Sequence, residues 1–282
     1  MAADLHCHTT MSDGSDTPEF VVHLAKTRGL SALAITDHDY YAGSYHADEL
    51  GKPYGFRVIN GVECSCRDVS RGHKVHILCY NCRHPDAVEH VLQKANRARA
   101  DAARQMIAKV AKLYPITEEM VMDGVGEGRF CGKQHIMLAL MKAGYASEMF
   151  GDLFRELFHS RTGRCCVPVL HNDMLDTMDC LRQSGGVIVM AHPSVYGSIA
   201  SLEDLIKAGI HGVEISHPCN KPEDVAVLRQ AAAAHGLLTT GGTDFHGYFA
   251  ERSRLLPLGS YTATDDELNC LLERSAQLWS GT

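Results

Sequence analysis

Short runs of β-branched and other apolar residues alternate along the chain with segments in which apolar residues recur at helical spacing. The strand-like runs are Asp4–Thr9, Ser31–Thr36, Arg57–Cys66, Lys74–Tyr80, Val187–Ala191, Gly212–Ser216 and Leu237–Gly241. The helical segments between them include Pro18–Arg28, Met174–Gln183, Leu202–Lys207 and Pro222–His235. Strands that alternate with helices indicate βα units and a parallel sheet. We therefore predict an α/β fold in which seven strands form a barrel resembling the (β/α)8 type, with the functional site at the C-terminal strand ends.

The alternation is interrupted between the fourth and fifth strands. Residues 84–164 contain no strand-like run, and apolar residues in Asp86–Leu113 recur close to helical spacing. Ile136–Met141 and Met149–Phe158 are also predicted helices, with Gly144 as a stop between them. We predict that 84–164 is a helical insertion that forms a lid or wall over the barrel mouth, and that 1–83 and 165–282 form the barrel.

Composition narrows the class of protein. Hydrophobic residues make up 45% of the 282 residues, which is typical of a globular protein with a sizeable core. The net charge of −7 argues against a groove for long duplex nucleic acid, and no apolar run is long enough to span a membrane. Eleven cysteines in a long chain without an export signal predict reduced thiols and a cytoplasmic protein. Cys79-x-x-Cys82 lacks the second cysteine pair that would complete a zinc site.

Every predicted strand ends near a potential metal ligand. In chain order these are His6, His8 and Asp13, then His38, Glu63, His76, His192, His217, and finally Asp244 and His246. Residues two apart on a strand point to the same face, so His6 and His8 can reach one ion. Burying so many unpaired polar groups would cost on the order of several kcal/mol unless something coordinates them. The pattern therefore predicts a metal cluster at the barrel mouth.

Five of these segments match, in order, the motifs of a known family. They are His6-Cys7-His8, Thr36-Asp37-His38, Gly61-Val62-Glu63, Ala191-His192-Pro193 and Thr243-Asp244-Phe245-His246. On these residues the sequence resembles the PHP (polymerase and histidinol phosphatase) family over nearly its whole length. The resemblance implies a distorted (β/α)7 barrel of the PHP type, with the helical insertion after the fourth strand, that binds two or three divalent ions.

The resemblance also implies which side chains bind the ions. His6, His8, Glu63 and Asp244 would hold the first ion, Glu63 would bridge to a second held by His76 and His192, and Asp13, His38 and His246 would hold a third. Asp13 stands where other members have a histidine. Because a carboxylate is a harder ligand than an imidazole, this favours Mn²⁺ or Mg²⁺ over Zn²⁺. Mn²⁺ is the expected ion, with Mg²⁺, Zn²⁺ or Fe²⁺ as alternatives.

The segment Asp4–Ser15, the insertion and Thr240–Gly247 resemble one subgroup in particular. That subgroup includes phosphatases of nucleoside 3′,5′-bisphosphates and enzymes that trim the 5′ ends of short RNA. The resemblance implies hydrolysis of the 3′-phosphate of a nucleotide such as adenosine 3′,5′-bisphosphate. The expected partner is thus a small phosphorylated nucleotide or a short RNA. The alternatives are a 5′–3′ exoribonuclease, a histidinol phosphatase and a non-catalytic metal-binding regulatory module.

The chemistry assigns further residues. Two ions about 4 Å apart would acidify a bridging water and clamp the phosphoryl oxygens, so that hydroxide attacks without a covalent enzyme intermediate. His217 is the candidate proton donor or phosphate ligand, and the alternative is a strand-end histidine capped by backbone. A substrate with two phosphates also needs a second anion pocket, because the metals satisfy only one. We predict that pocket from the basic residues of the insertion, with solvated surface charge as the alternative: Arg129, Lys133, His135, Arg161 and Arg164. The Arg-Pro-His phosphate-binding segment of the subgroup corresponds to Lys133-Gln134-His135.

Overall fold

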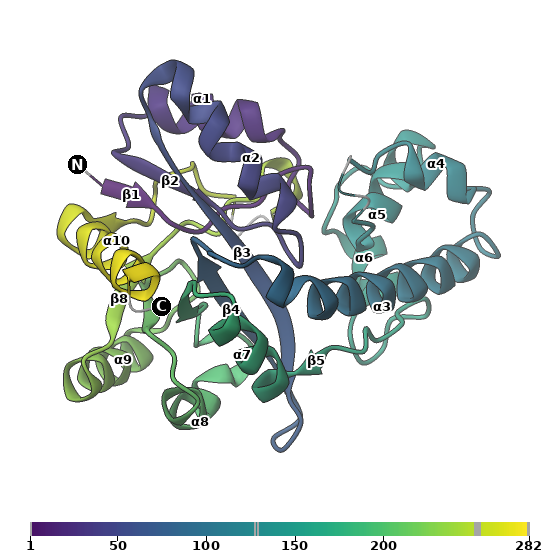
Figure 1. Ribbon diagram of the computed structural model, residues 1–282. Helices are drawn as coiled ribbons and strands as arrows, with labels where there is room; N and C mark the ends of the chain where they lie inside the picture. Colours follow the sequence, from purple (N-terminus) through teal and green to yellow (C-terminus); the bar gives the residue numbers. More distant parts are fainter. Residues whose placement is uncertain (1, 127, 129, 251–254, 281–282) are drawn as a thin grey trace.

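The computed structural model describes residues 2–126, 128, 130–250 and 255–280. Its strands form one nine-stranded sheet with the order β8-β7-β6-β4-β3-β2-β1-β9, and β5 pairs with β3. The strands are β1 Ala2–Asp4, β2 Ala32–Ile35, β3 Arg57–Asp68, β4 His73–Tyr80, β5 Asn172–Asp173, β6 Val187–Met190, β7 Gly212–Ser216, β8 Leu238–Gly241 and β9 Ala263–Thr264. The Leu5 amide donates to the Gly241 carbonyl at 3.0 Å, so the two ends of the sheet meet in a nearly closed barrel (Figure 1).

Helices surround the barrel (Figure 1). They are α1 Pro18–Thr27, α2 Ala42–Gly51, α7 Met174–Gln183, α8 Leu202–Lys207, α9 Pro222–His235 and α10 Asp265–Ser280. The described residues also form the 3₁₀ turns η1 Lys52–Tyr54, η2 Val195–Ser201 and η3 Gly247–Phe249. Local sequence sets where they begin. Thr17 caps α1 by accepting a hydrogen bond from the Phe20 amide, and Pro18 occupies the first helical position. The predicted barrel with a helical insertion is confirmed.

Among the strands that the sequence predicted, β4 runs against the expected parallel direction, and the unpredicted β9 also pairs antiparallel with β1. β4 pairs antiparallel with both β3 and β6, whereas β1, β2, β3 and β6, β7, β8 pair in parallel. Residues 69–72 join β3 to β4 without a helix, and such a short connection permits only a hairpin. The register places His76 opposite Ser65, two residues from Glu63. His76 and Glu63 are therefore diagonal neighbours on the same face of the sheet.

The first strand is shorter than its apolar pattern predicted. β1 ends at Asp4. In the rest of the predicted strand, residues 5–9, only Cys7 forms a β-bridge, which is parallel and pairs it with Phe245. The segment is held instead by single hydrogen bonds: the Asp244 amide donates to the His6 carbonyl at 2.9 Å, and the His8 amide to the Phe245 carbonyl at 2.8 Å. This close approach requires glycine at 242, because a Cβ there would lie 2.3 Å from the His6 Cβ.

The region between β4 and β5 is helical in its described part. Its helices are α3 Asp86–Val110, α4 Glu118–Met122, α5 Lys133–Lys142 and α6 Asp152–Phe158. The sequence did not indicate α4, and α5 begins three residues before its predicted start. The first turns of α3 pack Val88 and Leu92 into the barrel core, whereas Met106 and Val110 near its end belong to a separate core of the insertion. α3 thus carries the insertion out beside the barrel mouth (Figure 1).

The sequence predicted reduced cysteines and no membrane-spanning segment. All eleven cysteines are free thiols, and seven of them are buried. Within the part of the chain that the structure describes, no helix combines the length and the apolar character needed to cross a bilayer.

Candidate metal centre

The predicted ligands converge on the carboxylate of Glu63, which is buried near the middle of β3. Its Oε2 lies 3.3 Å from His6 Nε2, 3.2 Å from His8 Nε2 and 3.1 Å from His38 Nδ1. Its Oε1 lies 2.8 Å from both His76 Nδ1 and His192 Nε2. One carboxylate therefore contacts five imidazoles contributed by four separate segments of the chain.

Two aspartates complete the cluster. Asp244 Oδ1 lies 3.2 Å from His8 Nε2 and 3.6 Å from His6 Nε2, and Asp13 Oδ1 lies 3.3 Å from His246 Nε2. Four sets of side chains bring ligand atoms within 4.8 Å of one another: His8, Asp13, His38 and His246; His6, His8, Glu63 and Asp244; His6, Glu214 and His217; and His38, Glu63 and His76. The first two sets contain the groupings expected for the third and first ions. In the last set His38 stands beside Glu63 and His76, where the resemblance placed His192.

In His6, His8 and His246 the Nδ1 atom points away from the centre, and its hydrogen bond determines whether Nε2, which faces the centre, carries a proton or a lone pair. His6 Nδ1 lies 2.9 Å from Glu214 Oε1, and an ionised carboxylate can only accept, so in the neutral ring the proton is on Nδ1 and Nε2 keeps its lone pair. Ser12 Oγ donates to Asp37 Oδ1 at 2.6 Å, so it accepts from His8 Nδ1 at 3.4 Å, with the same result. His246 Nδ1 donates to the Asp244 carbonyl at 2.8 Å. Three imidazoles thus turn lone pairs inward, as metal ligands do.

The inward atoms fit bound cations in both burial and spacing. His6 Nε2, His8 Nε2 and His38 Nδ1 are buried, and none has a hydrogen-bond partner among the described residues. A buried polar nitrogen without a partner is costly unless it binds a ligand. Two ligands each about 2.1 Å from one ion are about 3.0–3.4 Å apart, which matches the spacing around Glu63 Oε2. Divalent ions are therefore the ligands that the cluster fits.

The carboxylates and imidazoles of the cluster shift one another's pKa values. Burial raises the pKa of Glu63, but His38, His76 and His6 outweigh burial and hold that pKa well below its ordinary value. For His8, burial lowers the pKa, yet the nearby carboxylates of Asp244 and Glu63 raise it to about 10. Protons and divalent cations compete for the same lone pairs, so metal binding here releases protons.

His217 presents a donor to the centre. Its Nδ1 accepts a hydrogen bond from the Cys219 amide at 3.1 Å, so in the neutral ring the proton is on Nε2. Burial lowers the pKa of His217, which favours that neutral form. Nε2 lies 3.5 Å from Asp244 Oδ2. An Nε2–H group has no lone pair for a metal, but it can donate to a phosphoryl oxygen.

Glu214 is a functional residue that the sequence reading missed. It is fully buried on β7, where it accepts from His6 Nδ1 at 2.9 Å and from the His192 amide at 2.7 Å. A carboxylate that accepts from a metal-binding imidazole orients the ring and increases its basicity. The available signal was a single charged residue within the apolar run Gly212–Ser216.

Replacing Glu214 with glutamine is expected to weaken Mn²⁺ binding about 10- to 100-fold, because a neutral amide is a poorer acceptor for His6 Nδ1–H. Calorimetric titration of the variant with Mn²⁺ measures the change. Glu203→Gln, at an exposed position on α8, is the matched control. An affinity equal to that of the unmodified protein would show that Glu214 does not act through the ligand.

A cavity of about 590 Å³ opens beside the centre, with Asp13 in its wall. Its basic lining residues are Arg67, Lys74, Arg99, Lys133, Arg161 and His171. Arg67 and Lys74 face each other on β3 and β4, and His171 precedes β5. Neither ring nitrogen of His171 has a hydrogen-bond partner among the described residues. Lys133 and Arg161, which were predicted to bind phosphate, therefore share this cavity with Arg67, Lys74 and His171 of the barrel, which were not.

The structure places two other predicted phosphate-binding residues outside this cavity, and Arg129 lies outside the described residues. His135 is buried, and its Nδ1 accepts from the Gly132 amide at 3.0 Å, which caps the start of α5. Arg164 is exposed and pairs with Glu156 at 2.7 Å. Both side chains have a structural explanation.

Comparisons with known proteins agree with this geometry. The family model for the PHP domain matches residues 4–159. The chain is 37% identical to the phosphoribosyl 1,2-cyclic phosphate 1,2-diphosphodiesterase of Eggerthella lenta, over 88% of this chain and 95% of that protein. It is 34% identical to the 5′-3′ exoribonuclease Rnm of Escherichia coli (86% and 84% covered) and 30% identical to the 3′,5′-nucleoside bisphosphate phosphatase of Chromobacterium violaceum (86% and 86%).

A crystal structure from Bifidobacterium adolescentis, assigned provisionally as a metal-dependent phosphoesterase, superposes with a TM-score of 0.87 at 31% identity and covers 96% of both chains. The barrel, the imidazole and carboxylate cluster at its mouth and these likenesses lead to one assignment. The chain belongs to the PHP family of metal-dependent phosphoesterases.

Proposed function

We propose that the protein hydrolyses a phosphate ester of a ribose that carries a second phosphate, foremost the 3′-phosphate of a nucleoside 3′,5′-bisphosphate. The observation that carries this proposal is the basic cavity beside the metal centre. Two binding regions for anions, one at the cluster and one at the basic lining, match a substrate with two phosphates.

The nine predicted ligands would hold two or three divalent ions, with Mn²⁺ preferred because of the Asp13 carboxylate. When bound, such ions acidify a water molecule and neutralise charge on the attacked phosphoryl group. The remaining work belongs to the chain. Glu214 and Ser12 fix the tautomers of His6 and His8, and His217 donates a hydrogen bond from Nε2–H to a phosphoryl oxygen. The basic cavity orients the substrate by its second phosphate.

The electrostatics of the cavity favour an anion. Burial lowers the pKa of Lys74, and the neighbouring cations Arg99 and Lys133 lower it further. Burial and the same kind of neighbours, Lys74 and Arg99 first, lower the pKa of His171 to about 3. Like charges held together repel one another, and a bound phosphate would relieve that repulsion. A phosphate would also give the His171 ring a hydrogen-bond partner.

A second candidate is a phosphoribosyl cyclic phosphate. It is favoured because the chain is 37% identical to the diphosphodiesterase named for that substrate and 30% identical to the bisphosphate phosphatase. The chemistry of recognition is the same: one phosphate would occupy the basic cavity while the centre hydrolyses the cyclic ester.

Activity assays on the manganese-loaded protein separate the candidates. The substrates are adenosine 3′,5′-bisphosphate, phosphoribosyl 1,2-cyclic phosphate, a short 5′-phosphorylated RNA and histidinol phosphate. We expect the highest kcat/KM with adenosine 3′,5′-bisphosphate. Hydrolysis of the cyclic phosphate alone would favour the second candidate, processive release of mononucleotides would assign an exoribonuclease, and turnover of histidinol phosphate alone would overturn the proposal.

Lys74→Ala should raise KM for adenosine 3′,5′-bisphosphate about tenfold or more, because a hydrogen bond to a charged group contributes about 1.5–3 kcal/mol. KM for adenosine 3′-monophosphate should change much less, because it lacks the second phosphate. Steady-state kinetics with both substrates provide the comparison. Arg164→Ala removes a cation that lies outside the cavity and should leave both values unchanged. Equal increases for the two substrates would show that Lys74 does not contact the second phosphate.

A further inference from the structure

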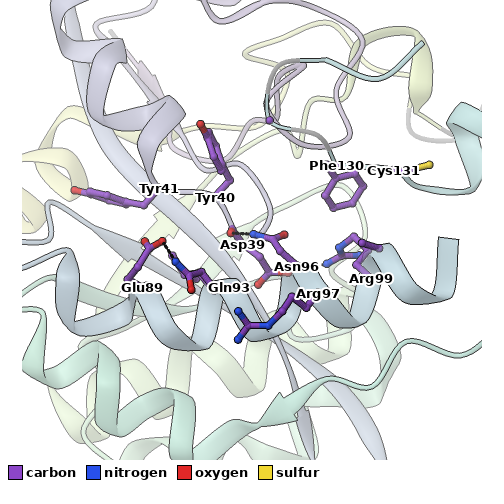
Figure 2. A pocket seen from close by; sticks show the side chains of 13 residues that line it. Asp39, Tyr40, Tyr41, Glu89, Gln93, Asn96, Arg97, Arg99, Phe130 and Cys131 are labelled. Atoms are coloured by element: carbon purple, nitrogen blue, oxygen red, sulfur yellow. Dashed lines mark hydrogen bonds and ion pairs between the residues drawn. The ribbon is translucent and has the colours of Figure 1, made fainter. Parts of the chain in front are cut away.

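A second cavity of about 410 Å³ lies between the residues that follow β2, the helix α3, and residues Gly128, Phe130 and Cys131 of the insertion. Figure 2 shows Tyr40 on one side of it, Phe130 on the other, and Asn96 and Arg97 of α3 below them. The function proposed above uses no part of this cavity except the wall that it shares with the basic cavity.

That wall consists mainly of Arg99 and Phe130, which line both cavities. The Phe130 ring also stacks on the ring of His38, with centroids 6.2 Å apart and planes inclined by 14°. Asp39, another lining residue, directly follows His38 in the chain. The second cavity therefore adjoins the metal centre. A substrate with one phosphate at the cluster and another in the basic cavity can extend a third group past Phe130.

Hydrogen bonds hold the wall in place. Arg99 donates to Asp39 Oδ2 at 2.7 Å and to Ser65 Oγ at 3.0 Å, and its guanidinium carbon lies 4.3 Å from the Phe130 ring centroid. Asn96 Nδ2 donates to the Asp39 carbonyl at 2.7 Å. Because these contacts link α3 to the barrel without a ligand, the shape of the cavity is preorganised, which lowers the entropic cost of binding.

The chemistry of the lining suits a flat ring with polar edges. Tyr40 and Phe130 offer aromatic faces on which such a ring can stack. Within the described part of the chain, Asn96 Oδ1 and the Arg97 guanidinium have no hydrogen-bond or ion-pair partner, so they can bond to the edge of a ligand. We propose that this cavity binds the base of the nucleotide substrate. The inference rests on the proposed function, because it assigns a further part of the same substrate.

Charge distinguishes this cavity from the basic one. Its lining contains two carboxylates, Asp39 and Glu89, and two guanidiniums, Arg97 and Arg99, of which Arg99 is paired with Asp39. The positive and negative charges balance, so the lining does not select a phosphate. An uncharged aromatic group is the better match, and the base is the only such group in a nucleoside bisphosphate.

A pair of variants at one position tests stacking. Tyr40→Leu removes the ring, and Tyr40→Phe keeps it. Base stacking on an aromatic side chain contributes enough for about a tenfold effect on binding. Tyr40→Leu should therefore raise KM for adenosine 3′,5′-bisphosphate about tenfold more than KM for the abasic ribose 3,5-bisphosphate, and Tyr40→Phe should not. Lys94→Ala, on α3 outside the cavity lining, is the control and should leave both values unchanged.

Arg97→Ala provides a second test at an exposed position, where loss of folding is not expected. It too should raise KM selectively for the substrate that carries a base. If Tyr40→Leu and Arg97→Ala change KM for both substrates equally, or change neither, the base is not bound in this cavity and the inference is overturned.

Binding of adenosine alone separates this inference from the proposed function. Adenosine has no phosphate, so calorimetry with the metal-loaded protein measures base recognition without catalysis. Adenosine binding that Tyr40→Leu weakens about tenfold would support the inference even if no bisphosphate were hydrolysed. Absence of adenosine binding would overturn it even if adenosine 3′,5′-bisphosphate proved to be the substrate.

Discussion

Replacing Glu63 with glutamine should lower kcat about 10³-fold or more in the manganese-loaded protein. The two oxygens of this carboxylate lie within 3.3 Å of nitrogens from His6, His8, His38, His76 and His192. A neutral amide at this point removes the charge that would be shared between ions. Metal ions stabilise the transition state of phosphoryl transfer by several kcal/mol, and a loss of about 4 kcal/mol corresponds to a factor of about 10³.

Phosphate release measures kcat for Glu63→Gln, and elemental analysis of the same sample measures bound manganese. We expect fewer ions per chain than in the unmodified protein and an unchanged circular dichroism spectrum. Glu203→Gln, on the exposed side of α8, should leave kcat and metal content unchanged. If Glu63→Gln kept more than a tenth of the turnover with a full complement of metal, Glu63 would not be a shared ligand.

The position of the cluster could be predicted from sequence because most of its candidate ligands follow strand ends, and strand ends are visible as the points where apolar runs stop. Glu63 and His76 instead lie within β3 and β4. The His6–His8 pair was inferred from strand alternation, yet β1 ends at Asp4. The two rings still converge because single hydrogen bonds from Asp244 and to Phe245 fix the segment. Both rings lie beside Glu63, although the backbone reaches that arrangement by a different route than strand alternation.

Residues that act through long-range contacts could not be predicted in the same way. Glu214 reaches His6 across the barrel, 208 residues away in sequence, and carries no local motif. Arg67 and Lys74 line the basic cavity because β4 runs antiparallel to β3, which a uniform βα reading does not foresee. Arg164 was assigned from its position in the insertion, but a carboxylate eight residues away, Glu156, pairs with it. The role of each of these residues depends on contacts with side chains that are distant in sequence or that the local pattern does not reveal.

His217 was identified from sequence as a proton donor or a phosphate ligand, and its hydrogen bonds favour the second role. A ring whose Nδ1 accepts from the Cys219 amide is neutral, and neutral imidazole gives up its Nε2 proton only reluctantly. Such a ring can stabilise charge on a phosphoryl oxygen without transferring a proton. His217→Ala should therefore lower kcat about 10²- to 10³-fold, as loss of one preorganised donor to a developing oxyanion does.

The choice of substrate and variant distinguishes a hydrogen-bond donor from a general acid. A donor to a non-leaving oxygen matters equally for good and poor leaving groups, so His217→Ala should slow p-nitrophenyl phosphate and phenyl phosphate by the same factor. A general acid matters mainly when the leaving group is poor, so its loss would slow phenyl phosphate far more. His217→Gln places an amide N–H near the position of Nε2 and should restore part of the lost rate. A large difference between the two aryl phosphates, with no recovery in His217→Gln, would instead assign His217 as the acid that protonates the leaving oxygen.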